Sequence, residues 1–283
     1  MSRSRLVIAL IVAAISLLGY YGSSVFNPVT QEKQHVGSIT PEQEIALGLQ
    51  AAPEMEQQFG GLDPDPNLQA KVDQVGGRLV AQSAAGKTPY QFQFHVLNDP
   101  ETINAFALPG GQVFITEGLL KRLQTEGQLA GVLGHEMGHV VARHGAEQMA
   151  KQQLTQGLTG AAVLATYDPN DPSSRNSAAV AAMIGQLVTM RFSRQDELQA
   201  DQLGVKLGGE SGYDPRSMIQ LMKILEESSQ GNQPPEFFST HPNPQNRIQL
   251  GNQLLSLQRY TSFGERAHLI HKVADRLLAR ECI

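Results

Sequence analysis

The feature that most constrains this chain is the run His135-Glu136-Met137-Gly138-His139, which reads H-E-x-x-H. The segment 126–144 around it has apolar residues at helical spacing and contains no proline. On a helix, two histidines four residues apart project from one face and can bind one ion, with Glu136 about 100° further round beside it. We therefore predict that His135 and His139 bind a metal ion and that Glu136 is a general base for a water molecule held there. A chance match is the alternative, so other features must support this prediction.

Composition narrows the class of protein. With 283 residues, 41% hydrophobic and 17% charged, the chain has enough apolar material for one large core. The net charge of -5 is mild and the basic residues are scattered, which excludes nucleic acid as an expected partner. Cys282 is the only cysteine, so neither an intramolecular disulfide nor a cysteine ligand near the motif is expected.

The N-terminus has the pattern of an export signal, because Arg3 and Arg5 precede an apolar run over residues 6–18. Residues 1–24 are expected to be either a cleaved signal peptide or an N-terminal membrane anchor. In both cases the positive arginines stay in the cytoplasm and the remainder of the chain crosses the membrane. Residues 25–39 lack periodicity and predict a tether, with one domain over 40–283.

A helix is predicted over 40–59 from its N-cap at Thr40 and the proline that follows. A second, amphipathic helix is predicted over 67–85 from its apolar spacing. Alternating residues over 90–97 predict a strand, and further strands are expected on either side of the turn at 109–111. The predicted fold is mainly α with a small antiparallel β-sheet. A peptide substrate can bind to the edge of such a sheet as an extra strand, so Asn104 is either a turn residue or a substrate-binding residue.

Three glycines of the motif helix, Gly131, Gly134 and Gly138, lie on one stripe beside the histidine face. Each destabilises a helix interior by about 0.8–1 kcal/mol relative to alanine, so we expect another element to pack very close to this stripe. His144 lies about 140° round the helix from His139 and is expected to point away from the metal.

A catalytic zinc ion needs a third protein ligand. The arrangement H-E-x-x-H-x-x-G-x-x-H is excluded, because Ala142 and Gly145 occupy its glycine and histidine positions. The segment 193–201 offers Glu197 and Asp201, four residues apart on a predicted helix. One of these carboxylates can bind the ion while the other orients a ligand imidazole.

Several separated motifs together resemble a known family: 104–111, 135–139, Glu197 with Ala200-Asp201, 212–215, and Thr240-His241-Pro242 with Arg247. The chain resembles the membrane-linked zinc peptidases of metallopeptidase family forty-eight, which are gluzincins and include the CAAX prenyl endopeptidase, HtpX, and the Oma1-type and BepA-type proteases. The resemblance covers roughly half of the chain.

The resemblance implies a zincin-like metallopeptidase domain with one zinc ion per chain. It makes His135, His139 and Glu197 the zinc ligands, Glu136 the catalytic base and Asp201 the partner of a ligand imidazole. It also implies that the Asn104-Ala105 pair binds substrate, and it makes His241 and Arg247 further catalytic candidates. For His241 two roles stay open: stabilising the oxyanion, or binding the open zinc position in a resting state.

Residues 151–191 separate the motif helix from Glu197 and contain two small-residue segments joined by a polar stretch at 168–174. Each segment is too short to cross a bilayer, so we expect a helical-hairpin insertion that acts as a lid or rests on the membrane surface.

The predicted function is a zinc-dependent endopeptidase with polypeptides as substrates. The resemblance implies that these are misfolded or membrane-associated proteins of the bacterial cell envelope. It also implies a periplasmic protein, either anchored in the inner membrane or soluble after cleavage of the signal. Two alternatives are a zinc-stabilised chaperone or binding module without turnover, and an aminopeptidase. The aminopeptidase would need an additional acidic group to bind a free N-terminus, and no motif supplies one.

Overall fold

The computed structural model describes residues 3–37, 39–166, 192–228 and 235–241, without the side chains of residues 3–6, 159–166 and 240. The chain is mostly helical with two small sheets, which confirms the predicted fold class. Arg247 and residues 167–191 of the expected insertion lie outside the described residues.

The main helices are α1 (Arg3–Gly22), α2 (Pro41–Gln58), α3 (Pro66–Gln82), α5 (Glu126–Val141), α6 (His144–Thr166), α8 (Arg194–Glu210) and α9 (Arg216–Ser228). Shorter helical turns are η1 (Ala84–Lys87), α4 (Glu117–Leu120) and α10 (Phe237–Thr240). The strands are β1 (Ser24–Asn27), β2 (Glu32–His35), β3 (Gln93–Leu97), β4 (Ala105–Leu108) and β5 (Gln112–Thr116). Helix α2 begins with a capping box between Thr40 and Gln43, as its sequence indicates.

The three-stranded sheet has the order β3-β5-β4 and is mixed. Strands β4 and β5 form the expected antiparallel hairpin, whose turn contains Gly110 and Gly111 at φ 87° and 110°. Strand β3 instead pairs with β5 in parallel, so the prediction of a wholly antiparallel sheet is wrong for this pair. The reason is the segment between β3 and β4, which carries the chain past β5 and places β4 on its far side.

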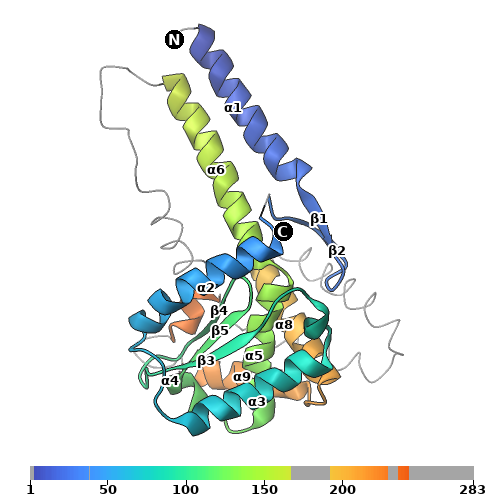
Figure 1. Cartoon of the computed structure of the whole chain (residues 1–283), viewed down its shortest axis with the longest axis vertical. Helices are drawn as coiled ribbons and strands as arrows, with labels where there is room; N and C mark the ends of the chain where they lie inside the picture. Colours follow the sequence, from blue (N-terminus) through green and yellow to red (C-terminus); the bar gives the residue numbers. More distant parts are fainter. Residues whose placement is uncertain (1–2, 38, 167–191, 229–234, 242–283) are drawn as a thin grey trace.

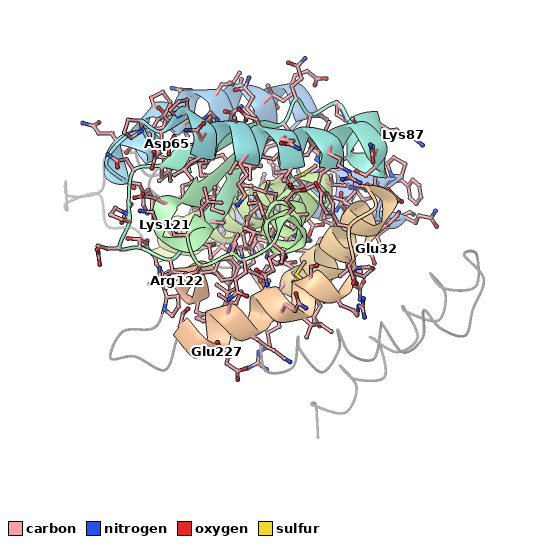
Figure 2. All side chains as sticks on the ribbon, turned by 90° about the horizontal axis from the view of Figure 1, so that it is seen from below. Glu32, Asp65, Lys87, Lys121, Arg122 and Glu227 are labelled. Atoms are coloured by element: carbon pink, nitrogen blue, oxygen red, sulfur yellow. The ribbon has the colours of Figure 1, made fainter. Side chains whose placement is uncertain are left out.

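Apolar residues cover both faces of this sheet. Phe114 faces α2, where it packs in a cluster with Ala52 and Met55. Its neighbours Val113 and Ile115 face the main core, which also contains the inner sides of α3, α5 and α9. Strand β5 is therefore buried along its whole length, and α5 lies in the centre of the body. Figure 2 shows this packed interior, with labelled charged side chains such as Asp65 and Lys121 at its periphery.

Residues 24–35 form a β-hairpin of β1 and β2. Two of its side chains bond to the C-terminal end of α5: Asn27 Nδ2 donates to the carbonyl of Val141 at 2.7 Å, and Gln34 Nε2 donates to the carbonyl of Ala142. The tether predicted over 25–39 is therefore corrected over residues 25–35, which belong to this β-hairpin and are bonded to the C-terminal end of the motif helix.

Helices α1 and α6 lie side by side and project together from the body (Figure 1). Their packing is close, since a Cβ atom at Gly157 of α6 would overlap Ser16 of α1. Large apolar side chains of α1 are exposed, among them Leu10, Ile15 and Leu18. Among the described residues, no helix has the length and apolar character needed to cross a membrane.

Candidate metal centre

Helix α5 carries the H-E-x-x-H motif and has a defined start. The Thr125 side chain accepts a hydrogen bond from the backbone of Gln128, and the Gln128 side chain bonds back to the backbone of Thr125. Every residue from Gln128 to Val141 is buried, because α5 is covered by the sheet and by α3, α8 and α9. Both motif histidines and Glu136 are thus held in the interior of the body.

The glycine stripe lets α8 approach the backbone of α5, as expected from the sequence. A Cβ atom at Gly138 would lie 2.9 Å from the carbonyl oxygen of Ala200, and one at Gly134 would lie 3.1 Å from that of Gly204. Gly131 faces α9 at ordinary contact distances. The close approach of α8 brings Glu197 within reach of the motif histidines.

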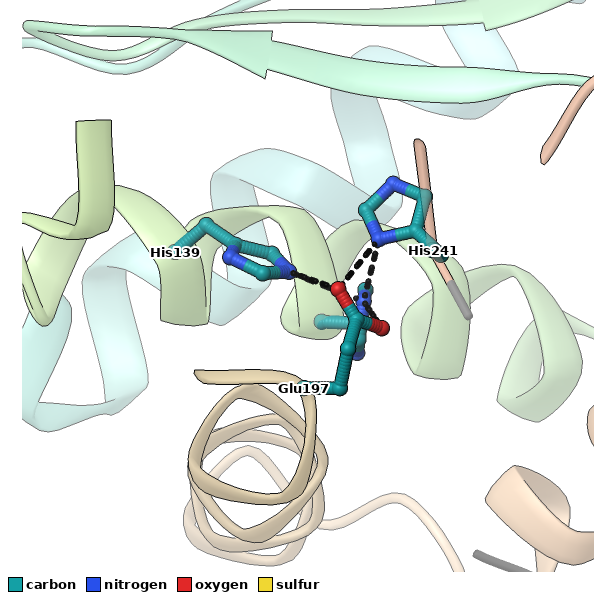
Figure 3. Close-up of side chains that lie close together, drawn as sticks. His139, Glu197 and His241 are labelled. Atoms are coloured by element: carbon teal, nitrogen blue, oxygen red, sulfur yellow. Dashed lines mark hydrogen bonds and ion pairs between the residues drawn. The ribbon is translucent and has the colours of Figure 1, made fainter. Parts of the chain in front are cut away.

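Four buried side chains form a cluster in which one ligand atom from each lies within 4.8 Å of the others: His135, His139, Glu197 and His241 (Figure 3). His139 Nε2 is 3.1 Å from His135 Nε2 and 3.4 Å from Glu197 Oε1, and His135 Nε2 is 3.6 Å from Glu197 Oε2. Ligands bound tetrahedrally at about 2.0–2.1 Å are separated by about 3.4 Å. These three residues therefore fit a small divalent ion, and imidazole with carboxylate is a donor set suited to zinc.

His241, the residue that follows the short helix α10, joins the cluster. Its Nδ1 atom is 2.9 Å from Glu197 Oε1 and 3.4 Å from His135 Nε2, while its Nε2 atom is 3.6 Å from Glu136 Oε1. Its ring stacks on Phe237 with centroids 4.3 Å apart. His241 thus lies between the candidate ligands and the candidate base.

Burial sets the charge state of this cluster. Removal from water lowers the pKa of His139 well below its usual value, which favours the neutral imidazole that binds metal. Burial acts to raise the pKa of Glu197, but the charge of His241 and the close polar contacts with His139 and His241 outweigh it, so this pKa lies well below its usual value. The carboxylate is therefore ionised beside neutral His139.

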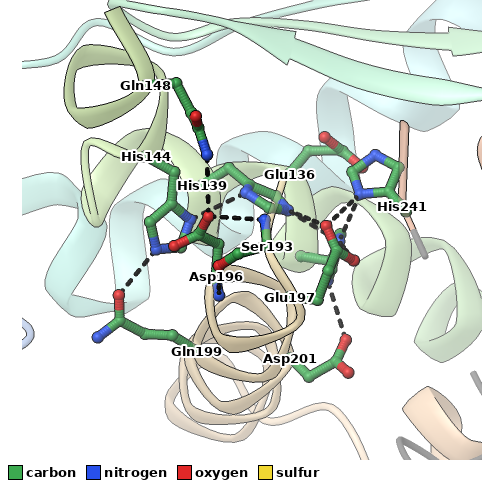
Figure 4. A network of polar contacts seen from close by, with 11 residues as sticks. Glu136, His139, His144, Gln148, Ser193, Asp196, Glu197, Gln199, Asp201 and His241 are labelled. Atoms are coloured by element: carbon green, nitrogen blue, oxygen red, sulfur yellow. Dashed lines mark hydrogen bonds and ion pairs between the residues drawn. The ribbon is translucent and has the colours of Figure 1, made fainter. Parts of the chain in front are cut away.

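Each motif histidine has a partner on its other ring nitrogen. His135 Nδ1 is 2.9 Å from Asp201 Oδ1, in the arrangement expected for an orienting carboxylate. His139 Nδ1 is 2.9 Å from Nδ1 of His144 (Figure 4). The expectation that His144 points away from the metal centre is corrected. The α5 helix ends at Val141, and Arg143 at φ 56° turns the chain so that His144 faces back.

A cleft beside the cluster contains the predicted substrate-binding strand. Its lining includes Asn104, residues 106–109 of β4 and the following turn, and His139 and His241. Asn104 is 3% exposed, and its Oδ1 atom has no hydrogen-bond partner among the described residues. Ala105 is buried and pairs with Ile115 of β5. Strand β4 pairs with β5 on one side, and within the described part of the chain no strand pairs with its other side.

Comparison with known proteins agrees with this arrangement. The model of Peptidase family M48 matches residues 66–252. The chain is 36% identical over 195 residues to the Beta-barrel assembly-enhancing protease of Escherichia coli (strain K12), an alignment that covers 65% of this chain and 38% of that protein. A protein of the same name from Yersinia pestis is 34% identical over 217 residues, covering 75% of this chain and 43% of the relative.

A further relative carries the name of a mitochondrial enzyme. The Mitochondrial metalloendopeptidase OMA1 of Schizosaccharomyces pombe is 35% identical over 186 residues, covering 62% of this chain and 50% of that protein. The chain thus spans half or less of the length of these relatives. Because the family model matches more than half of the chain and includes all four residues of the cluster, this protein belongs to Peptidase family M48.

Proposed function

We propose that this protein is a zinc-dependent endopeptidase whose zinc ligands are His135, His139 and Glu197. The observation that carries the proposal is the buried cluster of these three side chains at spacings that suit tetrahedral zinc, with Glu136 next to it. Family membership supports a peptidase. Imidazole and carboxylate ligands with one remaining position are the usual set of a catalytic zinc site.

The bound zinc ion would polarise the scissile carbonyl and lower the pKa of a water molecule toward about 7. Glu136 accepts the proton of the attacking water and delivers it to the nitrogen of the leaving amine. Asp201 orients His135 through Nδ1, which keeps the Nε2 lone pair of that ring directed at the cluster. Arg247 stays a catalytic candidate from the sequence, outside the described residues.

Substrate binding is proposed along β4. A polypeptide lying antiparallel to this edge would be held by backbone hydrogen bonds in the cleft beside the cluster. Asn104 Oδ1 is buried there without a partner in the described structure, so it is suited to accept a hydrogen bond from a substrate amide. Extended binding of this kind is tolerant of sequence and suits unfolded protein segments.

The proposed substrates are misfolded or membrane-associated proteins of a bacterial cell envelope. The N-terminal export pattern supports this location, and one set of relatives carries a name that refers to β-barrel assembly. Residues 1–24 serve as signal or anchor, residues 40–283 form the metallopeptidase domain, and the insertion at 151–191 acts near the cleft or the membrane surface.

His241 is proposed to hold the fourth metal position in a resting state. Its Nδ1 atom already lies among the three candidate ligands, at 2.9 Å from Glu197 Oε1, which supports this role over oxyanion stabilisation. The cleft is then closed to catalysis until the segment containing α10 moves.

The decisive experiment replaces Glu136 by glutamine and measures zinc content and casein cleavage. We expect the variant to retain one zinc ion and to lose about 10²–10⁴-fold in cleavage rate. Glu126→Gln, at the exposed start of the same helix, is the matched control and should cleave normally. Cleavage by Glu136→Gln at the wild-type rate would contradict the assignment. A zinc-loaded wild-type protein that binds unfolded protein without cleaving it would support a binding module instead.

A further inference from the structure

A chain of hydrogen bonds leads from the metal cluster to the β-hairpin at the N-terminus. His139 Nδ1 is 2.9 Å from Nδ1 of His144, and His144 Nε2 is 2.8 Å from Oε1 of Gln199 on α8. Gln199 Nε2 in turn donates to Oε2 of Glu32 on β2 at 2.7 Å. Figure 4 shows the Gln199, His144 and His139 part of this chain, and Figure 2 shows Glu32 beside α8.

The direction of each hydrogen bond follows from the acceptor-only carboxylate at the outer end. Glu32 requires the NH2 group of Gln199 to face it, so the carbonyl oxygen of Gln199 faces His144. That oxygen accepts only, so His144 Nε2 carries the hydrogen and, in the neutral ring, Nδ1 is the acceptor. His139 therefore donates from Nδ1, and its lone pair is on Nε2, the atom directed at the cluster.

The two motif histidines are thus oriented by different means. His135 has a carboxylate partner, Asp201, which is the usual arrangement at metal sites. The partner of His139 is the neutral imidazole of His144. Which nitrogen of the His144 ring donates and which accepts depends on the group bonded to its other side. Gln199 and Glu32, which lie outside the cluster, fix the hydrogen of the His144 ring on Nε2.

The hairpin that carries Glu32 is also fastened to the end of α5. The side chains of Asn27 and Gln34 satisfy the carbonyls of Val141 and Ala142, which have no partner within the helix. These bonds fix the turn after which His144 points back toward His139. We call the hydrogen-bond chain from His139 through His144 and Gln199 to Glu32 the relay. The hairpin, the turn and the relay are therefore connected to one another.

We propose that Glu32, Gln199 and His144 are positioning residues that fix the Nδ1–H tautomer of His139, so that metal affinity depends on the N-terminal hairpin. This inference rests on the proposed function in one respect, that the cluster binds zinc. None of the three residues needs to contact metal or substrate.

The test measures zinc affinity of the full chain by competition with a chelator. His144→Phe and Gln199→Leu should each weaken zinc binding by about 10–100-fold, the range found for partners of metal ligands. His144→Gln should retain most of the affinity, because its amide can accept from His139 and donate to Gln199. Gln148→Leu is the control, since Gln148 bonds to Asp196 outside the relay.

Coupling between the ends of the relay is tested with Glu32. Glu32→Ala should weaken zinc binding in the wild-type background and have no further effect when combined with His144→Phe. Additive losses would overturn the relay, because they would mean that Glu32 acts independently of His144.

Nitrogen NMR of the zinc-loaded, histidine-labelled wild-type protein reads the tautomers directly. We expect hydrogen on Nδ1 of His139 and on Nε2 of His144, and hydrogen on Nδ1 of His144 would overturn the proposal. A wild-type protein that binds no zinc would refute the proposed function itself. Normal zinc binding with an unaffected His144→Phe variant would refute only the relay.

Discussion

At the scale of single residues, glycine sets the distance between the two helices that carry the candidate ligands. An alanine at 138 would gain about 0.8–1 kcal/mol of helix propensity but would place Cβ 2.9 Å from the carbonyl of Ala200. Overpacking of this kind costs about 1–3 kcal/mol, and here it displaces α8, which carries Glu197. We expect Gly138→Ala to be less stable toward urea when metal-free and to bind zinc more weakly.

The matched control for that substitution is Gly77→Ala. Gly77 also lies inside a helix, α3, but a Cβ atom there would meet nothing within 4 Å. No overlap opposes the gain in helix propensity, so the free energy of unfolding in urea should increase by about 0.8–1 kcal/mol. Zinc affinity, measured separately by competition with a chelator, should be unchanged. If both variants become more stable, close packing of α5 on α8 does not limit residue 138.

His241 offers a second prediction at this scale. If its Nδ1 atom holds the fourth metal position at rest, His241→Ala should cleave casein faster than wild type and lose some zinc affinity. Steady-state cleavage and chelator competition, measured on the same preparation, check both effects. Slower cleavage with unchanged zinc affinity would instead favour oxyanion stabilisation.

Single residues also show what a sequence can predict about a site. The candidate ligands follow from chemistry and helical spacing, since His135 and His139 must share a face wherever the helix lies. The sequence predicts the wrong direction for His144, because the prediction extends the helical spacing beyond Val141, where α5 ends. The positive φ of Arg143 that ends α5 depends on tertiary contacts, including the hydrogen bonds from its guanidinium group to Glu44 and to the carbonyl of Ile39.

At the scale of elements, local pairings were predictable and distant ones were not. The turn at 109–111 identifies the β4–β5 hairpin, because glycine at positive φ has a local cause. The parallel partner of β5 is β3, and nothing in the alternation of either strand specifies direction. Helix α2 was predicted closely, because its cap at Thr40 lies next to it in the sequence. Helix α3 was predicted from its apolar spacing, and it ends at Gln82, before the expected residue 85.

The loop that leads into β4 provides a pH-dependent prediction. Burial acts to raise the pKa of Asp99, but hydrogen bonds from Thr102 and from the backbone of Glu101 outweigh it, so the pKa lies below its usual 3.8. A carboxyl whose pKa is lowered by folding stabilises the native state above its unfolded pKa and loses that contribution as pH falls through the folded pKa.

We therefore expect wild type to be more stable than Asp99→Asn above about pH 4, and the difference to shrink as pH falls below that value. Urea unfolding of both metal-free proteins between pH 2.5 and 7 measures this difference directly, and using metal-free protein removes the pH dependence of zinc binding. A difference that is constant over this range would mean that the Asp99 carboxyl has the same pKa in the folded and unfolded states.

At the scale of the whole molecule, the N-terminal region divides into two parts with different attachments. Helix α1 packs along α6, outside the body, whereas the hairpin at 24–35 bonds to α5 and α8. The sequence predicted a tether here, because four-residue strands rich in polar residues have no apolar periodicity. The strands are held by the buried side-chain amides of Asn27 and Gln34, which donate to backbone carbonyls at the end of α5. A local sequence pattern does not show such distant partners.

This division predicts different outcomes for two truncations. A protein that starts at Ser23 loses α1 but keeps the hairpin, so its zinc affinity should stay within about twofold of wild type, the expectation for a remote change that leaves the partners of the metal ligands intact. A protein that starts at Val36 keeps the apolar contacts of that residue but loses the bonds from Asn27 and Gln34 to the end of α5.

Each buried carbonyl left without a partner costs about 1–3 kcal/mol. A domain of this size loses about 2–4 °C in Tm per kcal/mol, so the shorter protein should unfold several degrees below the longer one. It should also bind zinc more weakly, because Glu32 is absent. Thermal unfolding and chelator competition on the two proteins test both statements. Equal Tm and equal zinc affinity would show that the hairpin does not support the metal-bearing helix.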